Sequence, residues 1–173
     1  RMPDSAAVLR SAGAGFRPWY RFFPWEDWRG GRPQILDDIV PLLDQWSSVA
    51  PKDEAPRPLS RGERLRQCFA TGGSPWDEEK ALDRYELLYE AGLVAEAARD
   101  GRSAARQWHD LPELGRPMAF DHRRILATAM GRLRGKLKYR PVVFELLPPE
   151  FTLLDLQKTV EAISGTLLHK QNF

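Results

Sequence analysis

A chain of 173 residues can form one compact domain, or one domain with a small appendix. Its 42% hydrophobic and 29% charged residues are typical of a globular protein and not of a disordered or fibrous one. The lone cysteine, Cys68, excludes an intrachain disulfide framework and favours a reducing cytoplasm, with the thiol buried among apolar neighbours. No apolar run approaches the ~20 residues of a membrane span, and no signal peptide is present.

The first element of note is an aromatic segment, residues 16–28, which holds seven aromatic side chains. Residues 1–15 before it are small and polar, and they predict a loop. Aromatic clusters of this kind can stack a nucleobase, but they more often close a core or an interface. We therefore expect the segment to pack.

The middle of the chain predicts helices with one short strand. A helix opened by Pro33 places its apolar residues on one face, with a kink or restart at Pro41; these residues are Ile35, Ile39, Leu42, Leu43 and Trp46. Residues 47–62 predict a surface loop and residues 63–69 a short strand. A second helix, capped by Ser74 and opened by Pro75, runs to Gly92, and polar residues 94–116 follow it.

The last third carries most of the positive charge. The net charge of the chain is only +2, but residues 121–173 hold nine Lys or Arg against five Asp or Glu. A helix is predicted from Asp121 to about Leu137, followed by a strand over residues 142–146. Between His122 and Arg140 there are seven cations and no acidic residue: Arg123, Arg124, Arg132, Arg134, Lys136, Lys138 and Arg140. Such a tract is typical of a surface that attracts DNA phosphates.

The end of the chain has the pattern of a helix–turn–helix. Thr152 and Asp155 form a capping box, Gly165 ends the helix, and Leu153, Leu156, Val160 and Ile163 are expected to form one buried face. A short turn then leads to His169, Lys170, Gln171, Asn172 and Phe173, where a recognition helix would read base edges. An ordinary helical hairpin is the competing interpretation. The chain begins without Met and stops inside this predicted helix, which suggests a fragment.

Enzymatic motifs are weak by comparison. The segment from Gly72 to Leu93 has some likeness to a Nudix box, whose helical carboxylates bind catalytic metals, but only Glu86 and Glu90 match. Two glutamates four residues apart usually form a solvated helix face. His109, His122 and His169 have no metal-ligand spacing, and no nucleophilic triad or phosphate-binding glycine loop is present. We therefore expect no catalytic residue and no bound metal.

Several motifs together resemble the Nudix-related transcriptional regulators of NAD synthesis, the NrtR-like family, and within it the NadQ branch of alphaproteobacteria. The motifs lie at residues 23–28, 75–79, 83–93, 115–129, 132–148, 151–157 and 169–173. The resemblance implies a Nudix-like effector domain, a linker helix and a winged helix that binds operator DNA as a homodimer. It implies repression of NAD biosynthesis genes under the control of ATP, NAD or ADP-ribose, with no required cofactor.

From the residues and the resemblance together we predict an α+β protein that does not act as an enzyme. Residues 1–70 would end a Nudix-like domain, residues 71–140 form a helical linker region, and residues 141–173 begin a truncated winged helix–turn–helix. The predicted DNA-contacting residues are His169, Lys170, Gln171, Asn172, Thr152, Arg134, Lys136, Lys138 and Arg140. Two alternatives stay open: a Nudix hydrolase acting on ADP-ribose or a related dinucleotide, and a helical interaction module with a basic face.

Overall fold

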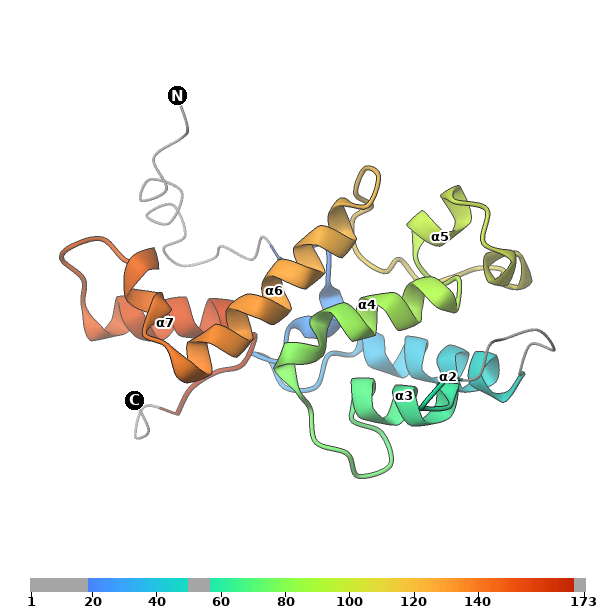
Figure 1. Cartoon of the computed structure of the whole chain (residues 1–173), viewed down its shortest axis with the longest axis horizontal. Helices are drawn as coiled ribbons and strands as arrows, with labels where there is room; N and C mark the ends of the chain where they lie inside the picture. The colour runs from blue at the N-terminus through green and yellow to red at the C-terminus, as the bar shows by residue number, and fades with distance from the viewer. Residues whose placement is uncertain (1–18, 50–56, 170–173) are drawn as a thin grey trace.

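The computed structural model describes residues 19–49 and 57–169, and this part of the chain is helical (Figure 1). The α-helices are α2 (Ile35–Ser48), α3 (Arg61–Phe69), α4 (Ala81–Glu90), α5 (Ala95–Arg99), α6 (His122–Tyr139) and α7 (Leu153–Ser164). Short 3-10 helices are η1 (Pro24–Glu26), η2 (Glu78–Lys80), η3 (Ser103–Gln107) and η4 (Val142–Leu146). These residues form no strand beyond one isolated bridge, Arg29 to Gly31. The α+β prediction is therefore wrong for the described chain.

Helix α2 forms much as predicted, but it passes through Pro41 without a break. A proline inside a helix removes one backbone hydrogen bond. Here Pro41 lies on the exposed face, while Leu36, Ile39, Leu43 and Trp46 on the opposite face are buried. Packing of that apolar face holds the helix together across the proline.

The strand predicted over residues 63–69 is wrong, because this segment belongs to α3. Ser60 and Glu63 form a reciprocal capping box that starts the helix. Leu65, Cys68 and Phe69 then fall on one buried face at helical spacing. Burial raises the pKa of the Cys68 thiol to about 11, as expected for a structural cysteine and not for a nucleophile.

The predicted start of α4 is several residues too early. The side chain of Asp77, and not Ser74, accepts a hydrogen bond from the amide of Glu79 and caps η2, from which α4 continues. Gly92 ends the helical region with a positive φ of 78°, as predicted.

Residues 142–146, predicted as a strand, form the 3-10 helix η4. The β-branched Val142 and Val143 suit a strand, but a strand needs a neighbour to pair its backbone, and the described chain offers none. Within η4 the side chain of Val143 is buried, whereas that of Phe144 is half exposed.

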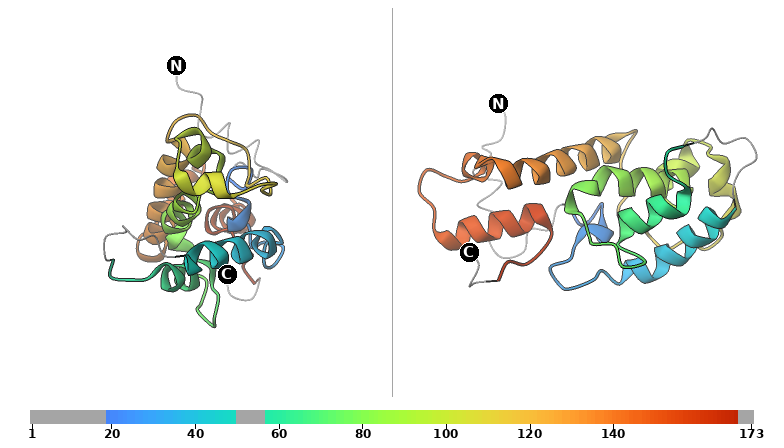
Figure 2. Two further views of the ribbon diagram at one scale, coloured as in Figure 1. Left: turned by 90° about the vertical axis from the view of Figure 1, so that its right-hand side faces the viewer. Right: turned by 60° about the horizontal axis from the view of Figure 1, so that its bottom comes forward.

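The core lies between α2, α3, α4 and α6, with the aromatic segment closing it. Phe23 and Trp25 are fully buried there, and their rings meet edge to face with centroids 5.7 Å apart. The packing interpretation of the aromatic segment is thus confirmed for residues 19–28. This core runs from Phe23 to Met130, so the expected boundary at residue 70 crosses one packed unit. Helix α7 and η4 lie at one end of the molecule, beside the last turns of α6 (Figure 2).

Candidate nucleic-acid interface

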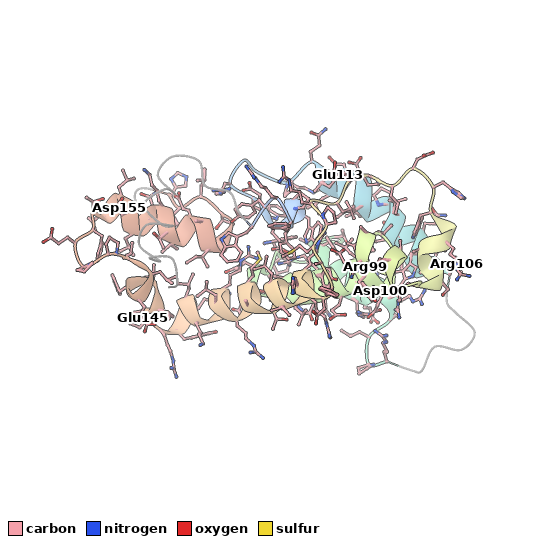
Figure 3. All side chains as sticks on the ribbon, turned by 90° about the horizontal axis from the view of Figure 1, so that it is seen from above. Arg99, Asp100, Arg106, Glu113, Glu145 and Asp155 are labelled. Atoms are coloured by element: carbon pink, nitrogen blue, oxygen red, sulfur yellow. The ribbon has the colours of Figure 1, made fainter. Side chains whose placement is uncertain are left out.

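Helix α7 begins at the capping box predicted from the sequence. The Thr152 hydroxyl accepts a hydrogen bond from the Asp155 amide at 3.2 Å, and the Asp155 carboxylate accepts one from the Thr152 amide at 2.9 Å. Hydrogen bonds from Thr152 lower the pKa of Asp155. Both residues are exposed at the end of the molecule formed by η4 and α7, where Figure 3 labels Asp155 and Glu145. The structure thereby gives Thr152, predicted to contact DNA, a role in starting the helix.

The end of α7 is also as predicted. Gly165 adopts a left-handed conformation with φ of 84°, and its amide donates to the carbonyl of Glu161 at 3.0 Å. The following turn is held by the Glu161 carboxylate, which accepts a hydrogen bond from the amide of Leu168 at 3.0 Å. His169 lies exposed just beyond that turn. Lys170, Gln171 and Asn172, together with any recognition helix, lie outside the described residues.

The predicted buried face of α7 is wrong. Leu156, Val160 and Ile163 are only partly buried, and Leu153 is 74% exposed. Neighbouring Leu154 and Phe151 are also exposed. Among the described elements α7 packs against η4 and α6, which cover only part of its surface.

The seven cations of the basic tract divide into three groups. Arg123 and Arg134 are buried, at 1% and 2% exposure. Arg124 pairs with Glu86, and the Lys138 ammonium lies 2.8 Å from the Glu79 carboxylate and 3.3 Å from that of Glu78. Three are exposed, without an acidic partner among residues 19–49 and 57–169: Arg132, Lys136 and Arg140. Four of the seven cations are therefore buried or paired within the fold, and three remain exposed to solvent.

The exposed cations form what we call the basic stripe: Arg132, Lys136 and Arg140. Arg132 and Lys136 are four residues apart on α6 and therefore project from similar directions, and Arg140 follows as the C-cap of the same helix. At 100° per residue, Arg132 and Lys136 lie opposite Arg134, which faces the core. The stripe can therefore meet an external anion such as a phosphate, whereas the side chain of Arg134, predicted to contact DNA, is buried in this arrangement.

Arg134 instead belongs to a buried ion cluster centred on Glu26. The Glu26 carboxylate is 2.6 Å from Nη1 of Arg134 and 3.0 Å from Nη2 of Arg84, and all three side chains are almost completely buried. Carbonyl oxygens accept further bonds from both guanidinium groups, including those of Cys68 and Asp77 from Arg84, while Nη2 of Arg134 has no hydrogen-bond partner among the described residues. Burial by itself would raise the pKa of Glu26, but the two arginines outweigh it and hold the pKa below its ordinary value.

This lowered pKa predicts acid sensitivity. Because Glu26 binds its proton less readily when folded, its contribution is complete above its ordinary pKa of 4.5 and is lost as the pH falls through the folded value. We expect the thermal unfolding midpoint to drop steeply between pH ~5 and pH ~3. Calorimetry of the chain and of Glu26→Gln checks this: the variant should show a shallower dependence, and parallel curves would contradict the assignment.

The Nudix-like segment does not assemble a metal site. The Glu90 carboxylate accepts bonds from Arg64 at 2.7 Å and from Arg57 at 3.0 Å, and Glu86 pairs with Arg124. Within the described ranges no group of three His, Cys, Asp or Glu side chains could hold a metal ion. None of the described helices is long and apolar enough to cross a membrane.

The sequence interpretation missed Glu26 and Tyr20, which adjoin α7 and the turn after it (the helix–turn unit, residues 153–168), and Arg84, which pairs with Glu26. One signal was present: Glu26 is a carboxylate inside a dense aromatic run. A buried charge must be paired, so this position called for a cationic partner. Nothing local to residue 26 identifies that partner as Arg134.

The sequence of this chain is similar to that of known proteins. A region of 56 residues is 43% identical to the ADPR responsive transcriptional repressor NtrR of Acinetobacter baylyi, covering 32% of this chain and 22% of that relative. The match thus spans about a fifth of the relative's length. The description of this relative agrees with the expectation of a regulator and not an enzyme. Residues 143–173 match the family model of the NrtR DNA-binding winged helix domain. The part of the chain that contains α7 and its turn is therefore similar in sequence to an NrtR winged-helix DNA-binding domain.

Proposed function

We propose that this chain is part of a DNA-binding transcriptional repressor of NAD biosynthesis genes, close to the NadQ branch. An adenine nucleotide or NAD-type metabolite would control it, and it would act as a cytoplasmic homodimer. The observation that carries the proposal is the capped helix α7 with its Gly165 turn, inside the segment similar to a winged-helix domain.

Electrostatics support DNA as the partner. In a winged helix–turn–helix, residues after the turn enter the major groove while nearby cations contact phosphates. Here His169 follows the turn, and the basic stripe lies on the neighbouring helix α6. Lys170, Gln171 and Asn172 would read base edges. Lys138, whose ammonium pairs with Glu78 and Glu79, would contact a phosphate only after leaving these carboxylates.

The effector and the targets are proposed on likeness alone. The relative's description names ADPR as the ligand to which that repressor responds, so ADP-ribose is the first candidate, with ATP and NAD as the others. In this proposal residues 1–70 end the effector part, residues 71–140 link it to DNA, and residues 141–173 begin the winged helix. The shared core would join the first two parts mechanically.

Binding to labelled duplexes tests the proposal directly. Fluorescence anisotropy would compare DNA from upstream of the host's NAD biosynthesis genes with a scrambled duplex of the same composition. We expect tighter binding to the upstream DNA, and a shift in affinity with ADP-ribose, ATP or NAD. Equal affinity for both duplexes would argue for a helical module with a basic face. Metal-dependent cleavage of ADP-ribose would argue for the hydrolase alternative.

The basic stripe gives a quantitative prediction. Replacing Arg132, Lys136 and Arg140 together with glutamine should weaken binding to every duplex alike, since phosphate contacts carry no sequence information. The slope of log K against log salt should become shallower by about 3, close to one unit for each lost phosphate contact. The matched control is Arg124→Gln, an exposed cation of α6 already paired with Glu86. A slope unchanged by the triple substitution would remove the stripe from the interface.

A further inference from the structure

The carboxyl end of α7 is capped by groups from elsewhere in the chain. Three carbonyls accept these bonds, each at 2.8 Å: that of Ala162 from the Tyr20 hydroxyl, that of Ile163 from Nε of Arg134, and that of Gly165 from the Trp28 amide. A helix end leaves its last four carbonyls without intrahelical partners. Here Tyr20, Trp28 and Arg134 supply the missing hydrogen-bond donors, so the carboxyl end of α7 is held against these three residues.

The contact at Gly165 is close enough to require glycine. A Cβ at this position would overlap the carbonyl oxygen of Glu26, and it would lie 3.2 Å from both the Tyr20 hydroxyl and Nη2 of Arg134. The obstructing atom at Glu26 is backbone and cannot turn aside. Gly165 therefore serves two purposes: its positive φ ends the helix, and its missing side chain lets the turn approach the segment before α2.

The positive charge of Arg134 suits its position at the carboxyl end of α7. Its guanidinium lies between the Glu26 carboxylate and the carboxyl end of α7, where the helix dipole favours a cation. It also donates to the carbonyl of Glu78 at 2.9 Å. Buried ion clusters add little net stability over apolar packing, because desolvation offsets their attraction. Their directional bonds do fix geometry, and this one joins α6, η1, η2 and α7.

We propose that Tyr20, Glu26, Trp28 and Arg134 form a docking seat that sets the orientation of the helix–turn unit toward DNA, with Arg134 as a positioning residue. The inference rests on the proposed function. The seat lies behind the turn and does not contact the nucleic acid. It fixes where His169 is presented relative to the basic stripe. Binding base edges and phosphates together requires that relative position.

The docking seat also connects the helix–turn unit to the rest of the chain. Tyr20, Glu26 and Trp28 precede α2, and Arg134 lies on α6, which packs along α4 (Figure 1). A shift of the aromatic segment or of α6 would release the capping bonds of α7. Undocking would then lower DNA affinity by adding the entropic loss of reorienting the unit at each binding event.

Two substitutions outside the helix–turn unit test the seat. Tyr20→Phe removes one hydrogen bond to α7 and keeps the ring. Arg134→Met keeps the apolar stem, and Glu26 retains its bonds from Arg84. We expect the dissociation constant for the upstream duplex to rise about threefold for Tyr20→Phe and about tenfold or more for Arg134→Met. The thermal unfolding midpoint should stay close to that of the parent while the dissociation constant rises. Arg124→Met, on the exposed face of α6, should change neither the midpoint nor the dissociation constant.

A matched glycine pair separates docking from backbone strain. Gly165→Ala and Gly101→Ala both place a Cβ on a residue of positive φ, 84° and 73°, but only the first meets another segment. Both should be strained to a similar degree. Only Gly165→Ala should abolish specific binding.

A readout without DNA keeps the two proposals distinguishable. The Trp28 amide donates to the Gly165 carbonyl, so its hydrogen exchange reports docking in the free protein. Exchange at Trp28 should accelerate at least fivefold in Arg134→Met and Gly165→Ala, but not in Gly101→Ala. If the full protein that contains this chain binds no duplex, the proposed function fails while exchange still decides docking. Unchanged exchange, or unchanged DNA affinity in variants of a chain that does bind, would overturn the seat.

Discussion

Replacing Glu26 with leucine is expected to lower the free energy of unfolding by about 3–5 kcal/mol, a large part of the stability of a small domain. The carboxylate is the shared counter-ion of Arg84 and Arg134. Without it, two guanidinium groups remain buried with carbonyl oxygens as their only polar partners. The loss comes chiefly from these uncompensated charges and not from the missing attraction itself.

Urea unfolding followed by circular dichroism measures the effect. Glu86→Leu is the matched control, since it removes a glutamate that pairs with the exposed Arg124, and it should change stability by less than about 1 kcal/mol. Replacing all three members of the cluster with apolar residues, Glu26→Leu with Arg84→Met and Arg134→Met, should recover much of the stability. A single Glu26→Leu variant as stable as its parent would mean that the arginines remain hydrated.

Replacing Trp25 with alanine is expected to cost about 3–5 kcal/mol. The side chain is fully buried, and its ring packs edge to face against Phe23. Removing it leaves a large cavity that the neighbouring helices can fill only partly, and the edge-to-face contact is lost as well. The expected loss follows from its complete burial in the core.

Phe120→Ala is the matched control for Trp25→Ala, because Phe120 is an aromatic side chain that is 76% exposed. Its removal should change the unfolding free energy by less than about 0.5 kcal/mol. Chemical denaturation of both variants compares them under one condition. If Trp25→Ala were no more destabilising than Phe120→Ala, the aromatic segment would not be part of the core.

Local chemistry in the sequence predicts the ends of α7 correctly. Thr152 and Asp155 cap the helix and Gly165 ends it, because a cap depends on side chains within a few residues of one another. The same reasoning was available for α3, where Ser60 and Glu63 carry the capping-box pattern. The alternation of residues 63–69 favours a strand only weakly because it is short, and the capping box indicates a helix more strongly.

Other mistaken predictions depend on partners far along the chain. Residues 142–146 have strand-forming side chains, but no neighbouring strand exists in the described structure to pair with them. Leu153 and Leu156 have the spacing of a buried helix face, yet periodicity shows only which residues share a face and not what covers it.

By itself, the sequence determined the two ends of α7, the packing role of the aromatic segment, the uneven charge, and the likeness of the C-terminal segment to a DNA-binding domain. Only the tertiary structure decided which cations of the basic tract face solvent. Arg134 and Lys136 differ by two positions on one helix, but one is buried and the other is exposed. The difference arises because Glu26, 108 residues earlier, meets Arg134 in the core. The capping box and the glycine turn of α7 depend on neighbours in sequence, whereas the burial of a charge depends on partners that only the folded chain brings together.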